Sequence, residues 1–209
     1  MFSLHHFFLK GGKFFTLLEE AAQEGIDSTN DLAAFMEAAP ASRQLEIISG
    51  HRANETRIAR QISEELVLTF VTELDRDDIE ALADAFYKIP KTVELFAKYV
   101  IAAGVHVRDV DFSRQIKLMA KATETLYAMT TELRHLRHLE HAQSLHKKLR
   151  RLDTEAEDNR MELLGDLYSG HYEPIRALAI HDLYKLCEKI MNRCTAVGNI
   201  LMHIFLKNN

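Results

Sequence analysis

The stretch TFVTELDRDDI, residues 69–79, decides the fold because it connects two long amphipathic helical patterns through one short corner. Apolar residues recur every four positions before it, at Ile58, Ile62, Leu66 and Phe70, and return with helical spacing after it, at Ile79, Leu82, Phe86, Ile89, Val93 and Phe96. Asp75 is placed as a helix N-cap, and Asp77 and Asp78 follow in the first turn, where carboxylates favour the helix dipole. The pattern predicts an antiparallel helical hairpin with Phe70 and Phe86 in the core beside the corner.

The composition is that of a globular protein with ample material for a core. The chain has 209 residues, of which 47% are hydrophobic and 27% charged. Its net charge of −5 argues against nucleic acid as a partner. No apolar run approaches the ~20 residues of a membrane span, and the N-terminus lacks the pattern of a signal peptide. We therefore expect a cytoplasmic protein.

The two cysteines, Cys187 and Cys194, are expected to be free thiols. They lie seven positions apart in a helical pattern, which separates their Cα atoms by about 10 Å. A disulfide needs less than about 7 Å. Free thiols are typical of a reducing compartment.

Few prolines and glycines interrupt the chain and no segment alternates with the period of a strand, so the sequence predicts an all-α protein of about six long helices. The expected helices cover residues 13–38, 40–70 with Pro40 at the first turn, 75–104 with Gly104 as the cap, 109 or 111 to about 134, 140–168, and 174–207. Pro90 is expected to kink the third. An unbroken helix from residue 109 to residue 164 would exceed about 70 Å, too long for a compact domain, so a break is expected; the family resemblance described below places it between residues 134 and 140.

The third and sixth helices look related. YKIPKTVELFAKYV (87–100) aligns with EKIMNRCTAVGNIL (188–201) at a constant offset of 101 residues (188 − 87), with coincident apolar positions. We interpret this as a duplication within a single domain, residues 1–209, whose halves cover approximately 13–104 and 109–207. The alternative is that any two amphipathic helices align at some register.

The corner pattern F-[IV]-T-x-x-[DE]-R-[DE]-D-I resembles that of the PhoU-like DUF47 family, the Pit accessory proteins. The opening FF-x-LLEEAA at residues 14–22 and the ending NILMHIFLKNN also fit this family. The resemblance implies a PhoU-like fold of two related antiparallel three-helix bundles. It implies a non-enzymatic accessory or regulatory protein of a Pit-type phosphate transporter, reached at the inner membrane from the cytoplasm. It also implies a homo-oligomer.

Some PhoU-like proteins bind iron or zinc through E-x-x-x-D pairs, whose spacing places both carboxylates on one helix face. The matching positions in the second half of this chain are Asp153, Glu157, Glu188 and Asn192. Those in the first half are Arg52, Thr56, Tyr87, Lys88 and Lys91, which include no carboxylate. A metal site is therefore expected only in the second half. The alternative is that its three carboxylates are solvated surface charges.

A histidine cluster, with His135, His138, His141 and His146, is the other unusual feature. Glu132 and His135 have the Glu-x-x-His spacing of di-iron carboxylate bundles, but no second copy exists. The cluster is therefore interpreted as a polar helix face or connector. One alternative function is a metal-dependent helical-bundle enzyme that uses the second-half carboxylates and nearby histidines. Another is a purely structural dimer that binds no metal. No catalytic residue can be named.

Overall fold

The computed structural model describes the backbone of residues 5–209 and the side chains of residues 12–209. Within these residues the chain forms six α-helices, three short 3-10 helices and no strand. The α-helices are α1 (His5–Glu37), α2 (Leu45–Leu68), α3 (Arg76–Ala103), α4 (Ser113–Thr131), α5 (Leu139–Leu167) and α6 (Pro174–Lys207). The 3-10 helices are η1 (Pro40–Ser42), η2 (Gly104–Val107) and η3 (Glu132–His135). The all-α prediction is confirmed.

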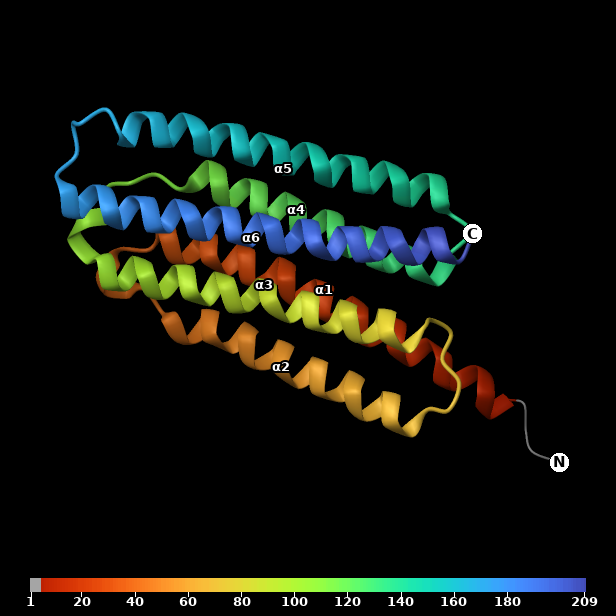
Figure 1. Ribbon diagram of the computed structural model, residues 1–209. Coiled ribbons are helices and arrows are strands. Elements are labelled where there is room, and N and C mark those ends of the chain that lie inside the picture. Colours follow the sequence, from red (N-terminus) through yellow and green to blue (C-terminus); the bar gives the residue numbers. More distant parts are fainter. Residues whose placement is uncertain (1–4) are drawn as a thin grey trace.

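The helices run lengthwise side by side as one elongated bundle (Figure 1). Helices α1, α2 and α3 pack on one another, and so do α4, α5 and α6. The two groups meet where α1 packs on α4 and α3 packs on α6, which leaves α2 and α5 on opposite outer sides (Figure 1). A duplication would produce this pairing of equivalent helices. The duplication itself stays a prediction, to be tested by superposing residues 13–104 on residues 109–207.

The structure differs from the prediction at the start of the second helix and agrees with it at the ends of the third and fourth. Pro40 opens only the 3-10 helix η1, because Arg43 and Gln44 have extended backbone and α2 begins at Leu45. The expectation that Pro40 starts the second helix was therefore wrong. The break required between the fourth and fifth helices exists, since α4 ends at Thr131 and α5 begins at Leu139. Helix α3 contains Pro90 and ends, as expected, at Gly104, whose φ of 52° favours glycine.

Of the two phenylalanines predicted in the core beside the α2–α3 corner, one is buried and the other is not. Phe86 lies in the core at 1% exposure, as predicted. Phe70 was also expected there, but it is 100% exposed because α2 ends at Leu68 and the helical stride stops with it. Leu74, at 3% exposure, is the loop residue that enters the core instead. The Asp75 cap is confirmed, since its Oδ1 accepts the Asp77 N–H at 3.1 Å.

An aromatic group joins the halves at the other end of the bundle. Phe96 of α3 packs edge-to-face on Phe112, the residue before α4, with ring centroids 5.4 Å apart. Phe112 in turn contacts Tyr184 of α6 at 5.8 Å. Such aromatic pairs add about 0.5–1.5 kcal/mol to the gain from burial alone. The core is therefore shared between the halves.

Helix α5 packs tightly against α6 at Gly198. A Cβ atom there would lie 2.2 Å from Leu149 Cδ2, so no side chain fits without movement. Cys187 and Cys194, also on α6, are buried and unpaired, as predicted. Burial raises the pKa of the Cys194 thiol to about 12. Across residues 5–209, none of the helices is both long and apolar enough to cross a membrane.

Candidate functional site

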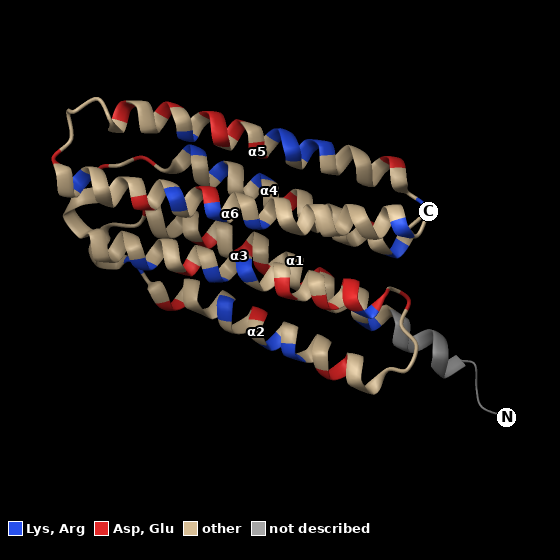
Figure 2. Cartoon of the chain, in the orientation of Figure 1, with Lys and Arg blue, Asp and Glu red and all other residues tan. Residues whose placement is uncertain are grey.

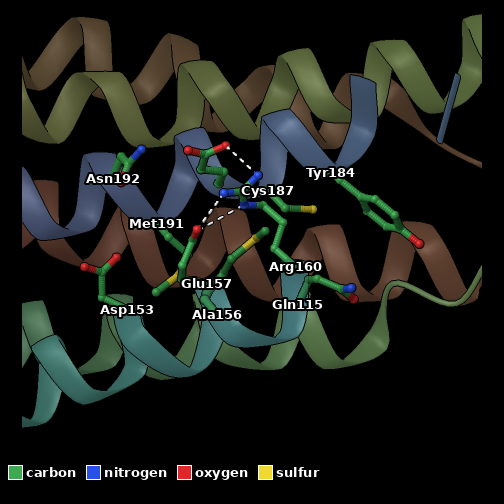
Figure 3. A pocket seen from close by; sticks show the side chains of 11 residues that line it. Gln115, Asp153, Ala156, Glu157, Arg160, Tyr184, Cys187, Met191 and Asn192 are labelled. Carbon is green, nitrogen blue, oxygen red and sulfur yellow. Dashed lines mark hydrogen bonds and ion pairs between the residues drawn. The ribbon is translucent and has the colours of Figure 1, made fainter. Parts of the chain in front are cut away.

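The four residues predicted as metal ligands line one pocket between α5 and α6 (Figure 3). Asp153 and Glu157 come from α5, and Glu188 and Asn192 come from α6. Four-residue spacing on each helix turns both members of a pair toward the facing helix. The remaining lining residues are Gln115, Met119, Ala156, Arg160, Tyr184, Cys187 and Met191. About 30 Å³ of free space remains, which suits a water molecule or a single ion and no organic substrate.

Arg160 is the central residue of this pocket, and the sequence reading did not identify it. Its Nη2 donates to Glu157 Oε1 at 2.7 Å and its Nε donates to Glu157 Oε2 at 3.0 Å. Its Nη1 lies 3.5 Å from Glu188 Oε2 on the facing helix. The hydrogen bonds with Glu157 raise the pKa of the Arg160 guanidinium. A resident cation therefore bridges two of the three predicted carboxylates.

The other oxygens of the pocket are not engaged by Arg160. Figure 3 shows Asp153 apart from the pair formed by Glu157 and Arg160. The closest cation to Asp153 is Arg150, at 3.9 Å. Gln115 is buried at 8% exposure, and its Oε1 has no hydrogen-bond partner among the described residues. The pocket thus retains a carboxylate and a buried amide oxygen as acceptors.

The carboxylates do not form a ready-made metal site. Among residues 12–209, whose side chains are described, no three His, Cys, Asp or Glu side chains converge in a metal-binding arrangement. Glu157 and Glu188 are directed at the Arg160 guanidinium (Figure 3). A hard cation would find suitable oxygen ligands here, but only after Arg160 moves away. The pocket as it stands is closed by an ion pair.

The equivalent positions in the first half are also ion-paired. Arg52 Nη1 donates to Glu94 Oε2 at 2.8 Å, and Lys98 lies 2.7 Å from Glu94 Oε1. Lys88 pairs with Asp84, and Lys91 lies over the Tyr87 ring. Two of these cations therefore have carboxylate partners outside the predicted positions: Glu94 on the facing helix α3 pairs with Arg52, and Asp84, one turn earlier on α3, pairs with Lys88.

Glu94 is the anchor of this first-half cluster. It is buried at 5% exposure and accepts a third hydrogen bond from Ser49 Oγ at 2.9 Å. Burial by itself raises the pKa of a carboxyl, but the hydrogen bonds from Lys98, Arg52 and Ser49 outweigh it and lower the pKa of Glu94 to about 2. Glu94 is therefore charged under all physiological conditions, and it holds α2 against α3.

A second polar group, only partly buried, joins α1 to α2, and the sequence reading missed it as well. His51 Nδ1 lies 2.9 Å from Glu24 Oε2, and His51 Nε2 lies 2.7 Å from Asp31 Oδ2. Burial lowers the pKa of His51, but hydrogen bonds to Asp31 and Glu24 outweigh it, so the pKa is raised. Glu55, one turn along α2, is 1% exposed, and its Oε2 has no partner among the described residues. Burial raises the pKa of Glu55 to about 8.

The histidine cluster is a polar connector, which agrees with its interpretation from the sequence. His138 Nδ1 and His141 Nδ1 contact the two oxygens of Glu132 at 2.9 and 3.1 Å. Both histidines are more than half exposed. Only His146 reaches toward the α5–α6 interface, where its Nε2 lies 2.9 Å from Asn199 Oδ1. Glu132 is therefore occupied at the break between α4 and α5 and is directed at no common site with Asp153 or Glu188.

Comparisons with known proteins agree with this architecture. No protein-family model matches the chain. The chain is 25% identical over 205 residues to the UPF0111 protein YkaA of Bacillus subtilis (strain 168), covering 95% of this chain and 98% of that protein. Its resemblance to the PhoU-like DUF47 family is confirmed over almost the whole length.

Two solved structures show the same fold. One is a PhoU-like phosphate regulatory protein from Shewanella oneidensis MR-1, with a TM-score of 0.78, 16% identity, and coverage of 93% of this chain and 99% of that chain. The other is a PhoU-like protein from the same organism, with a TM-score of 0.77, 17% identity, and coverage of 92% and 96%. The fold is therefore PhoU-like over at least 92% of the chain.

Proposed function

We propose that this protein is a non-enzymatic regulator of inorganic phosphate transport that acts on a Pit-type transporter. The observation that carries the proposal is the match of its fold, over 93% of this chain, to a protein described as a PhoU-like phosphate regulatory protein. The similarity to YkaA, which extends over both chains almost completely, supports it. In this proposal the protein self-associates, works in the cytoplasm and reaches the inner membrane through the transporter.

The pocket geometry favours this role over a metal-dependent enzyme. A catalytic metal requires a complete protein ligand set and an open coordination position for substrate. Here Arg160 holds Glu157 and Glu188, and Asn192 offers only a neutral oxygen. The side chains between α5 and α6 thus fit a binding or structural role better than a hydrolytic one.

We also propose that this pocket accepts one iron or zinc ion when Arg160 is displaced. Asp153, Glu157 and Glu188 would supply carboxylate oxygens, and Asn192 an amide oxygen. The first-half positions would bind none, because Arg52, Lys88 and Lys91 supply positive charge and no acceptor oxygen. Metal and guanidinium would compete for the same carboxylates.

Phosphate uptake tests the regulatory proposal directly. Deleting the gene should change the rate of uptake of labelled phosphate in cells grown with scarce or with abundant phosphate, and the wild-type gene should restore it. Unchanged uptake under both conditions would contradict the proposal. A turnover of any small substrate that Glu188→Ala abolishes would favour the enzyme instead.

A further inference from the structure

Four large apolar side chains project into solvent at the corner between α2 and α3. Val67, Leu68, Phe70 and Val71 are 83%, 71%, 100% and 57% exposed, and we call these four residues the apolar corner. Single exposed apolar residues are common on protein surfaces. A group of four within five consecutive positions is not, and contiguous exposed apolar surface marks interaction sites.

The apolar corner is held in place by hydrogen bonds. Arg76 donates from Nη1 to the Thr69 carbonyl at 2.9 Å and from Nη2 to the Leu66 carbonyl. The Thr69 N–H donates to the Glu65 carbonyl at 2.9 Å, and Thr72 Oγ1 donates to the Leu74 carbonyl at 2.7 Å. The buried Leu74 anchors the loop to the core. The chain therefore holds these apolar side chains outward in an ordered turn, and a surface depression lies along residues 66–70 and Arg76.

The surroundings of the apolar corner are acidic. Residues 64–80 contain seven carboxylates and a single basic residue, Arg76, whose guanidinium is engaged by the two carbonyls. Figure 2 shows these acidic residues gathered at the corner and along the start of α3. Arg60, Lys13 and Lys207 pair with four of them. Among the described side chains, Glu73, Asp77 and Glu80 have no ion-pair partner.

We propose that the apolar corner docks a basic amphipathic segment of another protein. Its apolar side chains would pack on Leu68 and Phe70, and its Lys or Arg side chains would meet Glu73 and Asp77. This inference goes beyond the regulatory role and does not depend on it. The chemistry that it requires is an apolar anchor flanked by positive charge.

The same charges disfavour the other possible occupants. An anionic membrane surface would repel the carboxylates around Phe70. A second copy docked corner to corner would bring the same acidic residues face to face, because a two-fold interface joins identical patches. A basic protein segment satisfies both the apolar and the acidic part of the surface.

Binding of a designed peptide to the purified full-length chain tests the proposal. The probe is a fluorescently labelled helical peptide with leucine on one face and lysine on the other, and its matched partner has glutamate in place of lysine. Fluorescence anisotropy measures Kd for wild type, Phe70→Ser, Glu73→Lys with Asp77→Lys, and the control Leu178→Ser. Leu178 is a suitable control because it is 61% exposed on α6, far along the chain from the corner.

The lysine peptide should bind wild type at least 10-fold more tightly than the glutamate peptide does, with an affinity that falls as salt rises. Phe70→Ser and the double charge reversal should each weaken binding about 10-fold or more, while Leu178→Ser should change it less than about 2-fold. Phe70→Ser should leave the thermal unfolding midpoint unchanged, since the side chain is fully exposed.

Three results would overturn the proposal: no binding up to millimolar peptide, equal binding of both peptides, or an equal loss in Leu178→Ser. Flotation with phosphatidylcholine or phosphatidylglycerol vesicles that Phe70→Ser abolishes would identify a lipid surface instead. Sedimentation that shows a dimer lost in Phe70→Ser would identify a second copy. Because these assays use purified protein, their outcome is separate from that of the phosphate uptake experiment.

Discussion

The Arg160 guanidinium on α5 lies 3.5 Å from the Glu188 carboxylate on α6. The same group makes hydrogen bonds to Glu157, three residues earlier on its own helix. It occupies the place that a shared cation would take between these two carboxylates (Figure 3). Either the protonated arginine or a metal ion could neutralise the repulsion between these two carboxylates, but not both at once. This competition can be tested.

Replacing Arg160 with glutamine should raise the affinity of the pocket for divalent cations. The change removes the resident positive charge and leaves three carboxylates that repel one another unless a cation binds. Calorimetric titration with iron, zinc, manganese and magnesium should show at least about a 10-fold tighter Kd than in wild type. The matched control adds Asp153→Ala and Glu188→Ala to the same variant and should abolish binding. Affinity that is the same in all three proteins would show that the pocket binds no metal.

The two phenylalanines of the α2–α3 hairpin should respond oppositely to truncation. Phe86→Ala should lower the free energy of unfolding by about 3–5 kcal/mol, because its ring is fully buried. Phe70→Ala should change it by less than about 0.5 kcal/mol, because its ring is fully exposed. Urea denaturation of both variants checks the difference. A large loss in Phe70→Ala would mean that the corner folds back onto the core.

Glu55 should make the protein less stable as the pH rises. The pKa of Glu55 is about 8 in the folded chain, against an ordinary value of 4.5, so the unfolded chain releases this proton first. The contribution of Glu55 to the free energy of unfolding is therefore fully present below pH 4.5 and is lost as the pH rises through about 8. Glu55→Gln keeps the shape of the neutral side chain and removes the ionisation.

Urea denaturation of wild type and Glu55→Gln at about pH 5 and about pH 8 measures this contribution. The glutamine variant should gain stability relative to wild type on going to the higher pH. His51→Gln is a useful companion, since the pKa of His51 is raised above 6.5 and its stabilisation is also lost with rising pH. An equal stability difference between wild type and Glu55→Gln at both pH values would show that Glu55 does not titrate in this range.

Adding a methyl group at Gly198 should destabilise the α5–α6 interface. The new Cβ would meet Leu149 Cδ2 at 2.2 Å, so the leucine or the helix must shift. We expect a loss of about 1–3 kcal/mol on thermal or urea unfolding. Gly165→Ala on α5 is the matched control, because no atom lies within 4 Å of its added Cβ. That variant should gain up to about 1 kcal/mol from the higher helix propensity of alanine, and a loss there as large as that in Gly198→Ala would contradict the close-approach argument.

The sequence predicted features that depend on local patterns. The Asp75 cap, the Gly104 terminus and the burial of Phe86 all follow from helical spacing and capping chemistry. Phe70 was misplaced because the four-residue spacing of apolar residues gives no sign that α2 stops at Leu68. Pro40 was misread because a proline that suits a first helical turn suits a 3-10 turn equally well.

Which side chains pair with one another could be predicted much less well from the sequence. The four residues predicted as metal ligands do line one pocket, since their spacing fixes their helix faces. Arg160 was overlooked, although its position three residues after Glu157 is a known pairing distance. Glu55 was overlooked because a charged residue in a helical pattern is normally assigned to solvent. Its burial depends on how α2 packs against neighbouring helices, which one sequence does not reveal.

The pairing of α1 with α4 and of α3 with α6 has a consequence for how the chain folds. Phe96 and Phe112 are adjacent across the link between the halves, so each half provides part of the other's interior. If the backbone were cut between Val107 and Ser113, each fragment would carry a bare apolar face. We expect the two fragments to be recovered in native form only when they are produced together, as complementing halves of one cooperative unit.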